Sequence, residues 1–312
     1  MADPRSTRPN PRDVRLAREI ARRHGLAAED ISPIVGHGSV NHVWVTGAGA
    51  ARAVIRFAID PLRTNELAVE AWCLRKAATA GIPSPGVIAQ GCLRDVPYLR
   101  QPFVQGAPGN ERRSPELWRT LGRYARTVHS IAVTDDAPAA LFSRFGRDLH
   151  EAWKAHLAYN VAQLTPADPL IALGVYSAGK QEWLRAALTE LNDADLAFGL
   201  CHGDLSLRNL LVRDTCDPVL IDWGSASAGL LPFGDLLPAV RAHRLIDDPS
   251  SAELEALAVG LGVRLEERWN TLECLLLLDA LDVVRWAIDQ RPDRLQDTIA
   301  AARACIQSPG RP

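Results

Sequence analysis

The chain has 312 residues, of which 47% are hydrophobic and 23% charged, and its formal net charge is -2. These values predict a globular protein with room for two lobes, and they argue against the basic surface of a nucleic-acid-binding protein. The six cysteines are scattered without a Cys-x-x-Cys pair, which favours buried thiols over disulfides and a cytoplasmic location. We expect no membrane partner, because the N-terminal segment lacks an apolar core and carboxylates interrupt the apolar run 272–286.

The N-terminal region predicts one helix followed by three short strands. Asn10 precedes Pro11, which is typical of an N-cap followed by a proline at the first helical position, and the helix should end near His24. Residues 1–9 are expected to form a tail. The side-chain pattern then predicts strands at 31–35, 40–46 and 51–58.

A glycine-containing loop, Gly36-His37-Gly38-Ser39-Val40-Asn41, joins the first two of these strands. Glycines allow backbone N–H groups to approach an anion closely, so Gly36, Gly38 and Ser39 are candidates for contact with nucleotide phosphates. A hairpin turn also favours glycines, and the loop by itself does not distinguish the two interpretations.

The third strand carries Arg52 and Arg56 on one face. A cation in such a strand holds the phosphates of a nucleotide, and Arg56 is the first candidate for this role. The alternative is a strand face exposed to solvent. A helix is predicted from residue 60 to residue 80, and its Glu70 is a candidate partner that would hold the arginine rotamer. We interpret Glu66 as a surface charge.

Two further strands are predicted at 87–93 and 97–104, and the second runs into a segment rich in Gly and Pro. A strand exposes backbone N–H and C=O groups where it enters a linker, and these groups can form hydrogen bonds with the edge of adenine. By position this segment is the linker between two lobes. Gln101 and Val104 are therefore candidate contacts for the base of a nucleotide.

The remainder of the chain is predicted to be mainly helical. Ser114-Pro115 opens a helix that ends near His129, for which a packed, structural role is favoured. Further helices are expected at 148–164, 179–193, 250–262, 265–290 and 293–307. Three aromatic residues of this region are expected either in the core or beside a substrate: Trp153, Tyr159 and Trp183.

The segment 201–224 carries the pattern on which a chemical interpretation depends. Asp204, five residues before Asn209, is placed to accept the proton of an attacking hydroxyl. Asn209 and Asp222 supply a neutral and an anionic oxygen, as Mg²⁺ requires beside nucleotide phosphates. Their spacing predicts a hairpin with strands at 210–212 and 219–221. Two other interpretations remain: turn-forming residues without chemistry, and a metal-dependent hydrolase.

The helix at 265–290 contains the only indication of a substrate. It is strongly apolar, yet Asp279, Asp282 and Asp289 share a face with Trp286 at helical spacing. Carboxylates on a buried helix cost free energy unless they are paired or hydrated, so a cleft for a cationic amine would explain them. Solvent exposure explains them equally, as do salt bridges to Arg285, Arg291 or Arg294.

The pattern His202-Gly203-Asp204, with Asn209 and the segment Ile221-Asp222-Trp223, resembles the signature of the aminoglycoside phosphotransferase and choline kinase-like family. The resemblance implies an α+β fold of two protein kinase-like lobes, with a small antiparallel-sheet N-lobe and a mainly helical C-lobe. It implies ATP and Mg²⁺ as cofactors and a small molecule with a hydroxyl group as the acceptor. A tail and helix at 1–27 would precede lobes at 28–107 and 111–308.

The same resemblance covers residues outside this segment. Asn41 matches the family's glycine-and-asparagine loop, and Glu70 matches the glutamate of an E…G-x-P pattern that reaches Pro83. Asp235 matches an aspartate that follows I-D-W, and it is expected to cap a helix and to brace the catalytic loop. Ser206 and Arg208 stand where relatives often have histidine and glycine, which puts the acceptor site in question.

The function expected from these features is transfer of the γ-phosphoryl group to a hydroxyl of an aminoglycoside, another antibiotic or an amino alcohol. A nucleotide-binding module without turnover is the first alternative, and the intact Asp204, Asn209 and Asp222 argue against it. A kinase of proteins is the second, and no Ala-Pro-Glu segment follows Asp222 to support it. The acceptor, the choice between ATP and GTP, and the oligomeric state are not specified by these patterns.

Overall fold

The structure is a computed structural model that describes residues 10–27, 29–34, 42–60, 64–214 and 217–307. Its contacts divide the chain into two compact units. Unit 1 holds the described residues of Met1–Arg112, Asp136–Ala140 and Arg208–Ala226, and unit 2 holds those of Arg113–Asp135, Leu141–Leu207 and Ser227–Pro312. The segment that carries Asn209 and Asp222 therefore clusters with unit 1, whereas the sequence-based boundaries placed it in the helical lobe.

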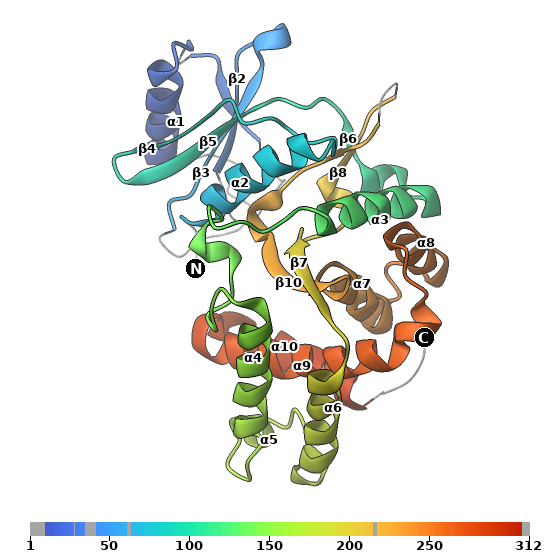
Figure 1. The fold of residues 1–312 in the computed structure, drawn as a ribbon. Helices are drawn as coiled ribbons and strands as arrows, with labels where there is room; N and C mark the ends of the chain where they lie inside the picture. Colours follow the sequence, from blue (N-terminus) through green and yellow to red (C-terminus); the bar gives the residue numbers. More distant parts are fainter. Residues whose placement is uncertain (1–9, 28, 35–41, 61–63, 215–216, 308–312) are drawn as a thin grey trace. The chain divides into compact units, whose positions relative to one another are not determined.

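Unit 1 contains a five-stranded antiparallel sheet with the strand order β1-β2-β3-β5-β4 (Figure 1). The central strand β3 pairs with β2 and β5, so that its Val54 lies opposite Val45 of β2 and Gln101 of β5. A second sheet has the order β6-β8-β9. The strands of the first sheet are β1 (Ile31–Pro33), β2 (His42–Thr46), β3 (Ala53–Phe57), β4 (Ala89–Leu93) and β5 (Val96–Pro102), and those of the second are β6 (Ala107–Pro108), β8 (Leu210–Val212) and β9 (Val219–Leu220).

Two helices pack on opposite faces of the larger sheet, α1 (Pro11–Arg23) and α2 (Glu66–Thr79). Ile55 and Phe57 are fully buried in one cluster with Ile20 of α1. Because side chains alternate along a strand, Arg56 points to the other face, where it contacts α2. Asn10 caps α1 as predicted, since its Oδ1 accepts a hydrogen bond from the Arg12 N–H at 3.0 Å.

The helix α2 begins later than the sequence predicts. It starts at Glu66, where residue 60 was expected, and Asn65 occupies the N-cap position without a side-chain capping bond. Asp60, where the helix was expected to begin, lies outside it, and residues 61–63 are outside the described residues. The first buried side chain of α2 is that of Leu67.

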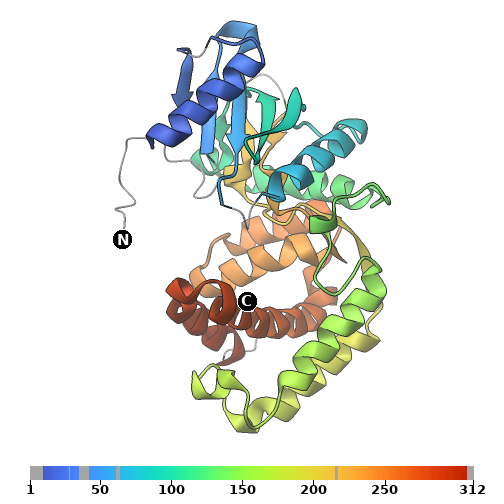
Figure 2. The same ribbon diagram turned by 90° about the vertical axis from the view of Figure 1, so that its left-hand side faces the viewer.

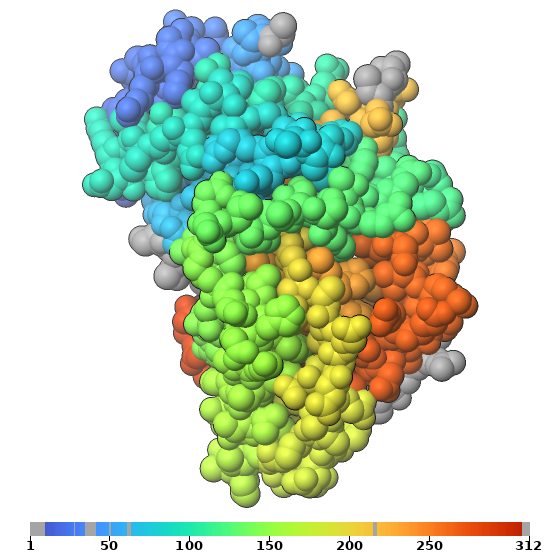
Figure 3. All heavy atoms as spheres, viewed as in Figure 1, coloured from blue at the N-terminus to red at the C-terminus, as the bar shows by residue number. Residues whose placement is uncertain are grey.

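Unit 2 is mainly helical and contains one antiparallel strand pair, β7 with β10. In Figure 2, α9 and α10 lie side by side, and in Figure 3 the side chains of α4 cover a surface next to those of α6. Among the described residues, no helix combines the length and the apolar character needed to cross a membrane. The elements of unit 2 are α3 (Pro115–His129), α4 (Leu149–Gln163), α5 (Pro169–Ala172), α6 (Gln181–Asp193), β7 (Ala197–Cys201), β10 (Ser227–Leu231), α7 (Phe233–Ile246), α8 (Ser251–Leu261), α9 (Leu265–Gln290) and α10 (Leu295–Gln307).

Glycines set the close approach of α3 to α8. A Cβ added at Gly122 would overlap the backbone of Leu257, and one added at Gly260 would overlap the backbone of Arg119. Two helix backbones approach this closely only where side chains are absent from both surfaces. Ser114 caps α3 as predicted, because its Oγ accepts from the Leu117 N–H at 3.3 Å.

Glu253, in the first turn of α8, ties this helix to Arg113. Its carboxylate accepts two hydrogen bonds from the Arg113 guanidinium, each at 2.5 Å, and one from the Ser250 N–H at 2.9 Å. The bond to Arg113 is the main cause that lowers the pKa of Glu253 from 4.5 to about 2. The stabilisation from Glu253 is therefore complete above pH 4.5 and is lost as the pH falls toward 2.

We expect Glu253→Gln to lower the free energy of unfolding by about 2 kcal/mol at pH 7. This value is less than the full conversion of the pKa shift, because the Arg113 side chain is 40% exposed and water screens the pair. Urea unfolding at neutral and acidic pH measures the effect. The difference between the variant and the wild type should shrink in acid, and a difference of equal size at both pH values would contradict the role of this carboxylate.

Candidate functional site

Arg56 of β3 is the centre of an ion-pair network in unit 1. Its Nη1 donates to Glu70 Oε1, and its Nη2 donates to Asp222 Oδ1 at 2.8 Å. The planar guanidinium presents both nitrogens at once, so one side chain holds two carboxylates. The pair that the sequence predicted between Arg56 and Glu70 is present, and Asp222 is an additional partner.

Glu70 is buried, with only 1% of its side chain exposed. Burial raises the pKa of the Glu70 carboxyl, and the charge of Arg56 acts in the opposite direction. Burial by itself would lower the pKa of Arg56, but Glu70 and Asp222 raise it, so the guanidinium keeps its charge. Arg56 Nε and Glu70 Oε2 are buried without a hydrogen-bond partner among the described residues. The nitrogen can therefore still donate one hydrogen bond, and the oxygen can still accept one.

Asn209 and Asp222 lie at the same end of the β8–β9 hairpin. The Ile221 N–H donates to the Asn209 C=O at 2.9 Å, which extends the ladder by one pair beyond Leu210 and Leu220. Asn209 is 5% exposed, whereas 41% of the Asp222 side chain is accessible. Asp222 has a left-handed backbone with φ of 64°, which Asp tolerates better than most residues.

These two side chains fit a magnesium ion by their chemistry. A neutral amide oxygen and a carboxylate are hard ligands of the kind that Mg²⁺ prefers, and Mg²⁺ in nucleotide sites uses few protein ligands and completes its shell with water and phosphate. The accessible carboxylate of Asp222 would receive the ion, and Arg56 would hold that carboxylate until it does.

The remaining candidate contacts for the nucleotide in unit 1, Gln101 and Val104, lie at the end of β5 and in the linker that follows it. The Phe103 N–H donates to the Arg52 C=O at 3.0 Å, so this amide is already used by the sheet. Gln101 is 5% exposed and its Nε2 donates to Glu70 Oε1 at 3.1 Å, so its side chain braces the ion-pair network. Val104 lines a cavity of about 330 Å³ together with Phe103 and Gln105. The loop candidates Gly36, Gly38, Ser39 and Asn41 lie outside the described residues.

The loop that carries Asp204 belongs to unit 2 and is anchored by Asp235. The N–H groups of His202 and Gly203 donate to the Asp235 carboxylate at 3.1 and 2.8 Å, and His129 Nε2 lies 2.9 Å from it. Gly203 has a φ of 79°, a conformation that glycine adopts without a steric cost. The expected bracing role of Asp235 and the structural role of His129 are therefore confirmed. The helix-capping role is wrong, because Pro232 occupies the N-cap of α7.

The buried thiol of Cys201 lies beside this anchor, and its Sγ donates to the Leu230 C=O at 3.5 Å. The ligand atoms of Cys201, His129 and Asp235 lie within 4.8 Å of one another. Burial raises the pKa of Cys201 well above its ordinary value, so the thiol stays protonated. Because both oxygens of Asp235 already accept hydrogen bonds, the chemistry of the cluster suits a hydrogen-bonded brace better than a metal centre.

The carboxylates of α9 have partners that the sequence analysis did not name. Asp279 Oδ2 accepts from Arg241 at 2.6 Å, and the Asp282 carboxylate contacts His156 at 2.7 Å and accepts from Asn160 at 2.9 Å. The predicted partners pair elsewhere, Arg285 with Asp168 and Arg291 with Asp293. Those arginines are close to the carboxylates in the sequence, but the actual partners come from α4 and α7. Asp289 and Trp286 are exposed.

Comparisons with known proteins agree with this architecture. A family model described as the phosphotransferase enzyme family matches residues 30–270. No curated protein matches the chain in a sequence search. Among solved structures, a macrolide 2'-phosphotransferase from Brachybacterium faecium is 22% identical, with 97% of this chain and 100% of that chain covered and a TM-score of 0.59.

Two other solved structures have similar folds. A thermostable mutant of an aminoglycoside phosphotransferase, in a ternary complex with AMP-PNP and hygromycin B, is 16% identical, with 94% and 97% of the two chains covered and a TM-score of 0.63. A microcompartment-associated aminopropanol kinase is 21% identical, with 94% and 95% covered and a TM-score of 0.57. These likenesses confirm the expected α+β, protein kinase-like fold with an antiparallel-sheet region and a mainly helical remainder.

Proposed function

The chain belongs to the phosphotransferase enzyme family, and from this premise we propose that it transfers the γ-phosphoryl group of ATP to a hydroxyl of a small molecule. The observation that carries the proposal is the network of Arg56, Glu70 and Asp222 beside Asn209 in unit 1. A buried cation next to two hard oxygen ligands is what a metal-bound triphosphate requires, and a structural ion pair alone does not need the second, accessible carboxylate.

Each side chain has a separate role in this proposal. Arg56, oriented by Glu70, neutralises the nucleotide phosphates, and Gln101 holds Glu70 in place. Asn209 and Asp222 bind Mg²⁺, which when bound offsets the charge of the phosphates. Asp204 accepts the hydrogen bond of the acceptor hydroxyl and then its proton. Because phosphoryl transfer needs little covalent chemistry from the protein, positioning and electrostatics supply most of the rate.

The proposal is tested by ADP release coupled to a spectrophotometric reaction. The full chain with Mg²⁺ and ATP should release ADP only when a suitable hydroxyl compound is present, from a panel of neutral alcohols, amino alcohols, aminoglycosides, macrolides and sugars. Phosphorylated acceptor should form in a one-to-one ratio with ADP. Tight binding of Mg-ATP with no ADP release across the whole panel would favour the alternative, a nucleotide-binding module without turnover.

A further inference from the structure

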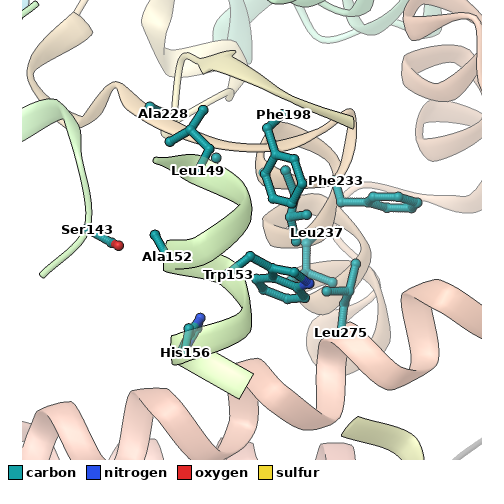
Figure 4. A pocket seen from close by; sticks show the side chains of 13 residues that line it. Ser143, Leu149, Ala152, Trp153, His156, Phe198, Ala228, Phe233, Leu237 and Leu275 are labelled. Atoms are coloured by element: carbon teal, nitrogen blue, oxygen red, sulfur yellow. The ribbon is translucent and has the colours of Figure 1, made fainter. Parts of the chain in front are cut away.

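Unit 2 contains a cavity of about 200 Å³ whose wall is formed by five of its elements (Figure 4). In Figure 4 the side chains of α4 form one side, and β7, α7 and α9 supply the others. The sequence indicated either a core position or a substrate contact for Trp153, and this residue lines the cavity. The lining also includes five large apolar side chains, those of Leu149, Phe198, Phe233, Leu237 and Leu275.

The cavity wall is mainly aromatic and aliphatic. Ser143 and His156 also line it, and Trp153 supplies a donor that lacks an acceptor among the described residues. The rings of Trp153 and Phe198 are tilted, with centroids 6.5 Å apart. Trp153 Nε1 is buried and has no hydrogen-bond partner among the described residues. In Figure 4 this nitrogen lies on the side of Leu237 and Leu275. A buried N–H without an acceptor costs free energy, and a ligand oxygen would remove that cost.

The cavity adjoins the loop that carries Asp204. Gly234 lines the cavity and precedes Asp235, whose carboxylate accepts from the Gly203 N–H at 2.8 Å. Phe198 also lines the cavity, on the strand that leads through Cys201 into this loop. A ligand in this cavity would therefore contact the elements that hold the Asp204 loop, and its hydroxyl would have to extend toward that loop to reach the carboxylate that we assign as the base.

The charges near the cavity do not suit a cationic substrate. Asp279 is paired with Arg241, and Asp282 is held by His156 and Asn160. Two of the three carboxylates that the sequence offered for an amine are thus already engaged, and the third, Asp289, does not line the cavity. An ammonium group in the apolar cavity would lose its hydration without gaining a free counter-charge, which is a large cost.

We propose that the acceptor is a neutral alcohol with a compact, ring-sized apolar body, which binds in this cavity and offers one oxygen atom to Trp153 Nε1. An engineered apolar cavity of about 150 Å³ holds a benzene ring, so the size here suits one ring with a short side chain. The inference rests on the proposed function. The acceptor oxygen forms a bond to the γ-phosphorus while the bond from that phosphorus to the bridging oxygen breaks. The hydroxyl proton passes to Asp204, and ADP leaves.

Three matched probes test the inference on the full chain: para-methoxyphenylpropanol, its para-ethyl analogue of nearly the same shape, and its derivative with an amine on the propanol chain. Isothermal titration measures binding, and ADP release measures turnover. We expect the methoxy compound to bind about fivefold more tightly than the ethyl compound, since a neutral hydrogen bond contributes about 1 kcal/mol. The amine should lower kcat/KM by about tenfold or more.

Trp153→Phe keeps an aromatic ring, removes the N–H donor and makes the side chain smaller. In this variant the methoxy and ethyl compounds should bind equally, because both lose the same apolar contact and only the methoxy compound loses a hydrogen bond. Trp183→Phe is the matched control, since Trp183 is 38% exposed and does not line the cavity. This control should keep the fivefold preference.

The outcomes separate the inference from the proposed function. Binding of the methoxy compound with its dependence on Trp153, but without ADP release from any acceptor, supports the assignment of the cavity and refutes the phosphotransfer. ADP release that favours the amine derivative or kanamycin over the neutral alcohols overturns the inference and leaves phosphotransfer intact. Failure of the neutral alcohols to bind also overturns it.

Discussion

Asp204→Asn is expected to reduce kcat by about a thousandfold and to leave the dissociation constant of Mg-ATP within about twofold of the wild type. The amide keeps the size of the side chain but cannot accept the proton of the acceptor hydroxyl. The loop should keep its shape, because Gly203 and His202 donate their backbone N–H groups to Asp235 and not to Asp204. Steady-state kinetics and nucleotide titration together measure the two quantities.

The control for this variant is Asp195→Asn, which makes the same chemical change at an exposed residue ahead of β7. It should leave kcat unchanged. If Asp204→Asn kept more than about a tenth of the wild-type kcat, Asp204 would not be the general base. If it instead weakened Mg-ATP binding strongly, the residue would act on the nucleotide.

Asp222→Ala is expected to abolish the stabilisation of the protein by Mg-ATP. For the wild type at a ligand concentration of about 100 times Kd, binding adds about 2.7 kcal/mol, which corresponds to a rise in Tm of about 4 °C for a chain of this size. The variant loses a metal ligand. Without nucleotide it should fold normally, because Arg56 keeps its ion pair with the buried Glu70 and Asp222 is itself 41% exposed.

Asp214→Ala is the matched control for this second variant. Asp214 lies on the same hairpin, 80% of its side chain is exposed, and its partner is Arg112. It removes the same charge and should keep the full rise in Tm. Omission of Mg²⁺ should reduce the rise for the wild type but change nothing for Asp222→Ala. An equal rise in Asp222→Ala and the wild type would contradict the metal-binding role.

Elements that depend on neighbouring residues were predicted well. The starts of α1 and α3 follow from Asn10-Pro11 and Ser114-Pro115, and both caps are present. The β8–β9 hairpin has the predicted strands, within one residue. A helix cap or a hairpin is formed by residues that are close in the chain, so a local sequence pattern is enough to predict it.

Features that depend on distant residues were missed or misassigned. The carboxylates of α9 find Arg241 and His156, and Asp235 binds backbone amides of the 202–204 loop in place of capping its own helix. The partners are separated by tens of residues, so periodicity within one helix carries no information about them. The late start of α2 has no local explanation among the described residues.

By itself the sequence determined the identities and order of the groups that we propose for phosphoryl transfer, Asp204, Asn209 and Asp222, because the chemistry of a side chain is set by the residue type. It also determined the pairing of Arg56 with Glu70, as a cation on a strand beside a carboxylate on the next helix. Only the tertiary structure decided which carboxylates are already neutralised and where an apolar cavity with an unpaired indole N–H lies. Burial, counter-charges and cavity volume come from contacts between elements far apart in the chain, and no local pattern specifies them.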